Sequence, residues 1–292
     1  MEEKSYDFYL SIWEALDNKE SYFWETKAYS AYCKKNNDRK KEKYRDQLKG
    51  FNREIKSQNR FLGKLGLYKP IINIRDYPKY SFFVQFRFKL RKPFYSNDDD
   101  DFYIIENSVT KEHVFKVPMM RASSWKGNFR STILKMNTTE RAPNTNEVIQ
   151  RLFGYTDERG DNQKKGRLIF YPTYFDQIGL EVIAPHNRDT KTVKNPIFYE
   201  VVPKGGSGFF SLLYIPFDLI GKENPDLKQI QYDYSVIFNT IVKMMTTYGF
   251  GAKTSSGYGV VEDRIEECII NMSSYKFSAF DEMQKVIEGG LS

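Results

Sequence analysis

The alternation of apolar and polar residues predicts several strands in the 292-residue chain. Residues Ser81–Leu90 alternate from Val84 onward, as expected for a half-buried strand. Further strands are predicted at Gly166–Asp176, Asn195–Val202, Gly208–Phe217 and Tyr258–Met272. The second and third of these flank the turn residues Pro203–Ser207, so we expect them to form a hairpin.

Apolar residues at helical spacing predict helices at Trp125–Met136, Asn146–Phe153, Lys228–Tyr248 and Ala279–Ile287. Upstream, residues 1–66 contain few β-branched residues, and Tyr6, Trp13 and Leu16 fall close to one helical face. A highly charged stretch continues this helical region, with an interruption expected at Gly50. The pattern therefore predicts an α+β protein with a basic helical extension over residues 1–74.

The net charge of +7 and the pI near 9.0 favour a polyanionic partner. Twelve Lys/Arg and four Asp/Glu lie between Lys34 and Lys64, so this stretch alone matches the excess positive charge of the whole protein. A solvated helix face explains this excess as well as a contact with RNA or a partner protein does.

Two cysteines, Cys33 and Cys268, are too few for a disulfide scaffold and lack the spacing of a zinc site. The chain has no apolar run near the roughly 20 residues that span a bilayer, and its N-terminus does not resemble a signal peptide. We expect a cytoplasmic protein without a metal or other cofactor. The acidic run Asn97–Asp101 lacks calcium-loop spacing and is expected to be a solvated loop tip.

A glycine-rich stretch, Tyr248–Val260, follows the third predicted helix. Positive φ angles and close approach of another chain are permitted by Gly249, Gly251, Gly257 and Gly259. Between them, Lys253, Thr254, Ser255 and Ser256 supply hydrogen-bond donors, which suits a phosphate backbone. A nucleotide-binding P-loop is excluded because it connects a strand to the following helix, whereas this stretch follows a helix. The alternative is a turn that only packs the helix on the next strand.

The segment Val117–Arg130 runs from a Pro-containing strand into a helix. Ser123 or Ser124 can cap that helix, leaving backbone N–H groups where a phosphate is favoured. Lys126 and Arg130 are four residues apart, so they share a face and would add charge-assisted contacts. The alternative is a capped surface helix with two solvated cations, and Trp125 is expected to pack rather than stack on a base.

These two segments resemble signature segments of the RAMP superfamily, the RNA-binding proteins of CRISPR systems. Leu152–Gly154 and Gly166–Phe170 are shorter matches to the same family. Val182–His186, followed by Asn195-Pro196 and the turn Val202–Gly205, looks like the last backbone subunit of Cmr-type complexes.

The resemblance implies two ferredoxin-like, RRM-related halves that form one RAMP module at residues 75–275, followed by a tail or short helix at 276–292. It implies an RNA-binding subunit of a type III CRISPR ribonucleoprotein that binds and caps the guide RNA backbone filament. Its partners would be the guide RNA, the complementary target RNA and neighbouring RAMP subunits. The residues expected to contact RNA are Arg121, Ser123, Ser124, Lys126, Arg130, Gly251, Lys253, Thr254, Ser255 and Ser256.

Catalysis stays open at two places, although no catalytic residue is assigned. In repeated backbone subunits of type III complexes, a loop aspartate cuts target RNA with metal help, and the nearest position here is Glu106. A guide-processing endoribonuclease would instead use His186 or His113, since histidine transfers protons near neutral pH. A third alternative is an adaptor whose basic N-terminal helices dock an acidic partner.

Overall fold

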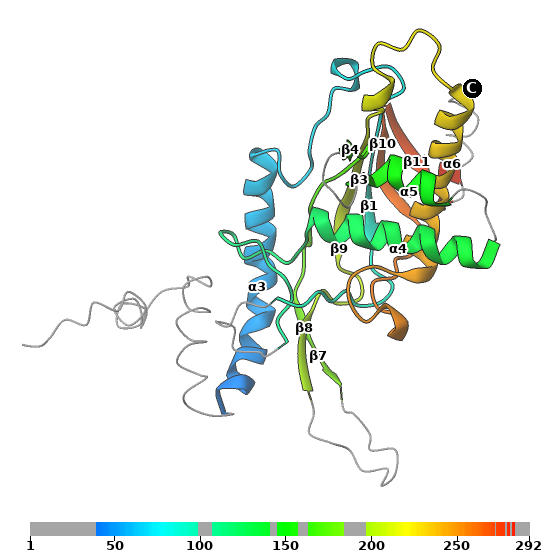
Figure 1. Ribbon diagram of the computed structural model, residues 1–292. Coiled ribbons are helices and arrows are strands. Elements are labelled where there is room, and N and C mark those ends of the chain that lie inside the picture. The colour runs from blue at the N-terminus through cyan, green and yellow to red at the C-terminus, as the bar shows by residue number, and fades with distance from the viewer. Residues whose placement is uncertain are drawn as a thin grey trace, which may run out of the picture.

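A five-stranded antiparallel sheet organises the chain (Figure 1). The computed structural model describes residues 39–98, 107–140, 145–156, 163–183, 197–271, 273–277, 279–280 and 282–283. In order across the sheet, the strands are β11 (Ser273–Phe277), β10 (Ile265–Ile270), β1 (Phe82–Lys89), β9 (Ser207–Tyr214) and β5 (Leu168–Phe170). Helices accompany this sheet, in agreement with the expected mixed α and β class.

Three helices lie on one side of the sheet: α4 (Ala122–Glu140), α5 (Thr145–Phe153) and α6 (Leu227–Lys243) (Figure 1). Along the chain, β1, α4, β5, β9, α6 and β10 follow in this order, and the strands stand side by side as β10, β1, β9 and β5. This is the arrangement of one β-α-β-β-α-β unit. The described strands outside this sheet pair only in twos. One ferredoxin-like unit is therefore seen among the described residues, and the second half stays a prediction.

The two-stranded pairs are β2 (Met119–Met120) with β6 (Thr173–Tyr174), β3 (Gly154–Thr156) with β4 (Gln163–Lys165), and β7 (Gly179–Ile183) with β8 (Ile197–Val201). The predicted hairpin around Pro203–Ser207 is wrong, because β8 pairs with β7 whereas β9 pairs with β1 and β5. The turn Pro203–Ser207 instead forms hydrogen bonds with Leu90, the residue that follows β1. Gly205 N donates to Leu90 O, and Leu90 N donates to Gly206 O, each at 2.8 Å.

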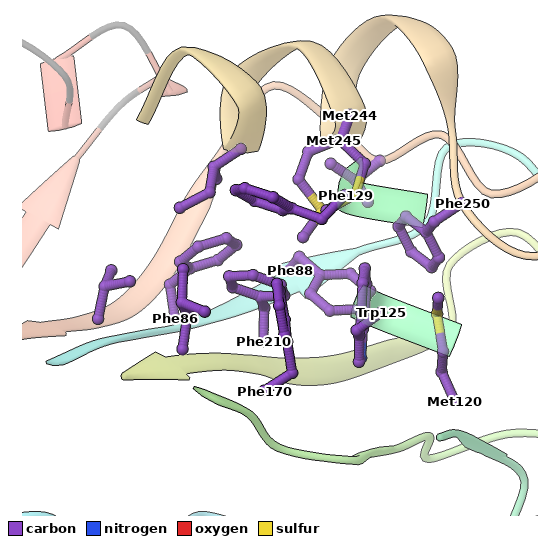
Figure 2. Packing of buried hydrophobic residues seen from close by; sticks show 14 of the residues in the cluster. Phe86, Phe88, Met120, Trp125, Phe129, Phe170, Phe210, Met244, Met245 and Phe250 are labelled. Carbon is purple, nitrogen blue, oxygen red and sulfur yellow. The ribbon is translucent and has the colours of Figure 1, made fainter. Parts of the chain in front are cut away.

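The side chains of β1 that face the helices form the centre of the core. Figure 2 shows Phe86 and Phe88 beside Phe210, Trp125 and Phe250. The Trp125 ring centre lies 5.0 Å from that of Phe210 and 4.6 Å from that of Phe250. Ring pairs of this kind contribute about 0.5–1.5 kcal/mol each beyond the burial of their area.

The opposite face of β1 is buried at Phe83 and Gln85, whereas Arg87 is part-exposed and Lys89 is exposed, as expected for a half-buried strand. Phe83 packs with Leu213 and Ile215 against a segment that contains the 3₁₀ turn η1 (Ile74–Asp76). Gln85 is 1% exposed, because its Nε2 donates to Pro70 O and to Ser211 Oγ, each at 3.0 Å. Gln85, the first polar position of the alternating pattern, is therefore covered and hydrogen-bonded.

Helix α3 (Arg39–Lys64) lies on the other side of the sheet from α4 and α6 (Figure 1). It continues through Gly50 without the predicted interruption. Ile55 and Leu62 are fully buried, and Asn59 Nδ2 donates to Phe175 O at 2.9 Å. Residues 1–38 of the expected extension lie outside the described residues. None of the helices in the described ranges is both long and apolar enough to cross a membrane.

Two other predicted helices are confirmed. Asn146–Phe153 corresponds to α5, and Lys228–Tyr248 corresponds to α6 followed by a π-helical turn, η3 (Met244–Tyr248). Two further 3₁₀ turns are η2 (Phe217–Leu219) and η4 (Thr254–Ser256). Of the predicted helix Ala279–Ile287, the described helical residues are 280, 282 and 283.

Candidate nucleic-acid interface

The start of α4 presents three exposed cations, Arg121, Lys126 and Arg130. The helix begins at Ala122, and Trp125 N donates to Arg121 O at 3.0 Å. Arg121 therefore occupies the position before the first turn. Ser123 and Ser124 lie inside that turn, so the prediction that either one caps the helix is wrong. Among the described residues, neither Lys126 nor Arg130 has an ion-pair partner.

Gly127 stands between these cations in the interior of α4, and it is exposed. A Cβ built at Gly127 would meet no atom within 4 Å among the described residues. A glycine inside a helix is about 1 kcal/mol less favourable than alanine. The packing of the described chain therefore does not require glycine at this position. Glycine also makes the helix less stable than alanine would.

Trp125 anchors the start of α4 in the core, as the sequence analysis expected. Its side chain is fully buried, and its Nε1 donates to Thr173 Oγ1 at 3.0 Å. The Thr173 hydroxyl in turn donates to Phe209 O at 2.6 Å. Since Trp125 also packs on Phe250, the same side chain fixes α4 and the first residues of the glycine-rich stretch.

The glycines of the stretch Tyr248–Val260 allow it to fold against its own protein. Gly251 has a φ of 86°, and a Cβ there would lie 2.5 Å from Tyr95 O. Gly259 has a φ of 70°, and its Cβ would lie 1.9 Å from Phe250 O. Both positions therefore require glycine. Ala252 N also donates to Tyr95 O at 2.7 Å, so this amide already has its acceptor.

The polar residues of the stretch form its tip, beside β8. Lys253 adopts a left-handed φ of 59°, and its Nζ lies 4.4 Å from the centre of the Tyr199 ring. This is a cation–π geometry. Thr254–Ser256 form the turn η4, in which Ser255 and Ser256 are exposed. Hydroxyl groups and one ammonium group thus share a short, ordered turn.

Asn128 joins the two segments, and sequence analysis missed it. Its Oδ1 accepts a hydrogen bond from Gly251 N at 3.2 Å, and its Nδ2 donates to Ser124 O at 2.8 Å. The structure therefore brings the first turns of α4 next to the glycine-rich stretch, although the two are 123 residues apart. The only signal in the sequence was the place of Asn128 directly after Lys126-Gly127.

The β7–β8 pair extends away from the main sheet (Figure 1). Side chains of both strands contact the glycine-rich stretch. The Tyr258 hydroxyl donates to Glu181 Oε2 on β7. Burial, followed by the hydrogen bond and the negative charge of Glu181, raises the pKa of Tyr258. The ring of Tyr199 on β8 also meets Tyr95 edge to face, with 5.3 Å between centres. The stretch is thus held from both α4 and β7–β8.

Asp98 belongs to the acidic run that was expected to be a solvated loop tip, but it is buried, with 9% of its surface exposed. Its Oδ2 accepts from Lys111 N at 3.4 Å, and its Oδ1 lies 3.9 Å from Arg121 Nη2. That expectation is wrong for Asp98, and residues 99–101 lie outside the described ranges. The charge of Arg121 is consequently shared with a carboxylate of its own chain.

The segment after Glu106 is attached to β8. Glu200 N donates to Asn107 O at 2.9 Å, and the buried ammonium group of Lys111 contacts the buried Glu200 carboxylate. Val109 N also donates to Glu200 Oε2 at 3.3 Å. This segment therefore reaches the same strand as Lys253, which contacts Tyr199.

Glu106 and His186 lie outside the described residues, while His113 is exposed in a turn. Within the described ranges, no group of three or more His, Cys, Asp or Glu side chains could hold a metal ion.

Comparisons with known proteins place these segments in a family. The CRISPR system Cms endoribonuclease Csm3 of Streptococcus thermophilus is 28% identical over 171 residues, which cover 54% of this chain and 74% of that protein. A chain of the type III-B Cmr-beta complex bound to cognate target RNA aligns with a TM-score of 0.47 and 18% identity, covering 90% of this chain and 88% of that chain. A chain of the type III-B Cmr-beta complex in the apo state aligns with a TM-score of 0.44 and 13% identity. The alignment covers 65% of this chain and 98% of that chain.

The family model described as the RAMP superfamily matches residues 100–262, more than half of the sequence. The match contains α4 and the glycine-rich stretch, the two segments that meet at Asn128 and Gly251. This chain belongs to the RAMP superfamily.

Proposed function

We propose that this chain is an RNA-binding subunit of a type III CRISPR ribonucleoprotein, in which it holds the phosphate backbone of the guide RNA. The observation that carries the proposal is the hydrogen bond between Gly251 N and Asn128 Oδ1, at 3.2 Å. It joins α4, which carries the exposed cations Lys126 and Arg130, to the stretch that contains the polar turn Thr254–Ser256. Family membership and the Csm3 relative support the same role.

The residues of this interface suit a polyanion rather than particular bases. Lys126 and Arg130 provide two exposed positive charges in the first half of α4. The dipole and backbone N–H groups at the beginning of the same helix also favour an anion. Ser255 and Ser256 add hydroxyl donors. Contacts with phosphates supply affinity without reading sequence, so the subunit accepts guides of any spacer sequence.

Gly127 gives this proposal a further support. The fold has free space at this position, and alanine would make the helix more stable. A glycine between Lys126 and Asn128 lets a strand come close to the backbone of α4, where a methyl group would stand in its way. We therefore assign Gly127 to the contact with RNA rather than to the packing of the chain.

Binding of guide-length RNA at several salt concentrations tests the proposal. Fluorescence anisotropy with two unrelated spacer sequences should give similar affinities that fall steeply between about 50 and 200 mM salt. The double variant Lys126→Glu/Arg130→Glu should bind more weakly, with a salt slope reduced by about 0.7 for each lost phosphate contact. The control is Lys79→Glu/Lys228→Glu, which reverses two exposed charges outside both segments. An affinity that does not depend on salt, or equal binding by both double variants, would contradict the proposal.

A second candidate function is cleavage of target RNA with metal help through Glu106. The Csm3 relative favours it, because that protein is named an endoribonuclease. The test is Glu106→Ala in the reconstituted complex with magnesium and a complementary target, with assembly measured on the same sample. Loss of cutting with intact assembly supports this function. Unchanged cutting removes it.

We also propose that the subunit caps the backbone filament beside a neighbouring RAMP subunit, with residues 1–74 as an extension and 276–292 as a tail. Because Ile55 and Leu62 are buried, the extension is best shortened by deleting residues 1–38 only. A loss of RNA affinity then assigns this part to the guide, and a loss of complex assembly alone assigns it to a neighbouring subunit.

A further inference from the structure

A second basic site lies on the side of the sheet away from α4 and α6. A cavity of about 790 Å³ opens between α3, residues 68–71 and the main sheet. Helix α3 contributes Lys56, Asn59 and Arg60 to the lining of the cavity, and strand β1 of the sheet contributes Arg87. The interface formed by α4 and the glycine-rich stretch contributes no residue to this cavity.

The cavity is rich in positive charge. Lys56 and Arg60 are exposed, and Arg87 is part-exposed beside them. Among the described lining residues, Asp176 is the one carboxylate, and it is engaged by Ser207, whose N and Oγ each donate to it at 2.7 Å. Arg87 and Lys69, which also lines the cavity, are ion-paired with Glu267 at 3.5 Å and 3.1 Å. The excess of positive charge therefore comes from Lys56 and Arg60, and it favours an anionic ligand.

Two buried polar atoms in the wall of the cavity lack partners. Asn59 is 5% exposed, and its Oδ1 has no hydrogen bond within the described chain, although its Nδ2 donates to Phe175 O. Arg87 Nε is also buried without an acceptor there. Buried polar groups are almost always paired, so an unpaired acceptor and an unpaired donor on two residues that line the same cavity indicate a missing partner. Both atoms are covered by the chain itself, so each side chain has to turn toward the cavity before a ligand, or a water bound beside it, can pair with it.

Apolar surface lies beside these polar groups. Tyr68 and Ile71 line the cavity, and Ile71 is 91% exposed. The Tyr68 ring is held edge to face against Phe209, with 5.5 Å between centres. The volume falls within the roughly 300–1,000 Å³ of small-molecule sites. Cations next to an aromatic and aliphatic wall suit a ligand that has a phosphate at one end and a flat ring at the other.

We propose that this cavity binds a nucleotide. Lys56 and Arg60 hold its phosphate, and the base lies against Tyr68 and Ile71, where Asn59 and Arg87 meet its polar edge. A base offers both donors and acceptors, whereas the carboxylate of an acidic peptide side chain would leave the Asn59 oxygen without a donor. The inference goes beyond the proposed guide contact, because this cavity and the α4 interface share no residue.

Calorimetric titration of the full-length protein tests this site with the four nucleoside 5′-monophosphates, a tetranucleotide, inorganic phosphate and oligoglutamate. Saturable binding of a mononucleotide or the tetranucleotide is expected, and it should weaken at least tenfold in Lys56→Glu/Arg60→Glu. Ile71→Asp should weaken nucleotide binding more than phosphate binding. The controls are Lys79→Glu/Lys228→Glu and the interface variant Lys126→Glu/Arg130→Glu, and mononucleotide binding should persist in both.

Tighter binding of the tetranucleotide than of every mononucleotide assigns the site to an RNA strand, and the reverse assigns it to a free nucleotide. Either result supports the inference and is independent of the guide-binding test. Three results overturn it: no nucleotide binds, phosphate binds as tightly as every nucleotide, or oligoglutamate binds more tightly than any nucleotide. Unchanged nucleotide binding in Lys56→Glu/Arg60→Glu also overturns it.

Discussion

The side chain of Asn128 accepts a hydrogen bond from the backbone N–H of Gly251 at 3.2 Å, which ties α4 to the glycine-rich stretch. Asn128→Ala removes this acceptor and should lower the free energy of unfolding by about 1 kcal/mol. The affinity for guide RNA should fall as well, because the two halves of the interface lose their link. Urea unfolding and RNA anisotropy measure the two effects, with the exposed substitution Gln231→Ala on α6 as the control. An unchanged RNA affinity would separate Asn128 from the interface.

Gly127→Ala should change stability and RNA affinity in opposite directions. Alanine fills open space in α4 and should raise the free energy of unfolding by about 1 kcal/mol. The added methyl group should weaken binding of guide RNA severalfold, because it occupies the surface that the strand approaches. Thermal unfolding and anisotropy on the same preparation check both. A variant that is more stable and binds RNA equally well would show that Gly127 has no part in the interface.

Gly259→Ala should harm the fold itself. Its φ is 70°, and the new Cβ would lie 1.9 Å from Phe250 O, so the backbone has to move. We expect a loss of more than about 2 kcal/mol in the free energy of unfolding, the range of strained backbone sites. Gly257→Ala is the matched control, since its φ is 83° but a Cβ there meets no atom within 4 Å. Equal losses in the two variants would mean that φ strain alone matters.

Much of the fold follows from local sequence. Strand β1 and helices α5 and α6 were predicted because hydrophobic periodicity over eight or more residues reflects a buried face, and the structure has the same faces. The pairing of β8 was missed, because the partner of a strand depends on contacts far away in the sequence. Here the turn after β8 bonds to Leu90, and this leaves β9 free to join the main sheet.

The candidate interface was predicted only in part, for a similar reason. Lys126, Arg130 and the polar tip of the glycine-rich stretch are visible as motifs, and the structure brings the two segments together. The hydrogen bond of Asn128 and the packing of Tyr199 under Lys253 join residues that are distant in sequence, so no local pattern predicts either contact. The burial of Asp98 is likewise set by distant residues, Lys111 and Arg121.

Outside the candidate interface, the charged side chains of Arg151, Arg167 and Asp233 form a buried network. Asp233 is fully buried, and its carboxylate accepts from Arg167 Nη1 at 2.7 Å and from Arg151 Nη2 at 2.6 Å. Asp233→Ala leaves two guanidinium groups without their shared partner and should lower the free energy of unfolding by about 3–5 kcal/mol.

Urea unfolding of Asp233→Ala and Asp218→Ala separates burial from pairing, because both carboxylates bind Arg167 but the Asp218 side chain is 50% exposed. The Asp218 variant should lose much less, since a partly exposed pair contributes about 0–1 kcal/mol. Similar losses in both would mean that the burial of Asp233 does not set its importance.

Burial raises the pKa of Cys268 from its ordinary value of 9.0 to about 12. In a Cys33→Ser background, a disulfide reagent at about pH 8.5 should therefore label Cys268 far more slowly in the native protein than in urea. The folded chain also keeps the thiol proton at a pH where the unfolded chain loses it. This contribution to stability is complete below pH 9 and is lost as the pH rises toward 12. Between pH 9 and pH 12, the free energy of unfolding should therefore fall less in Cys33→Ser/Cys268→Ala than in the Cys33→Ser parent. Denaturant titrations at several pH values measure this difference. Equal labelling rates in the native and unfolded states would contradict the buried, protonated thiol.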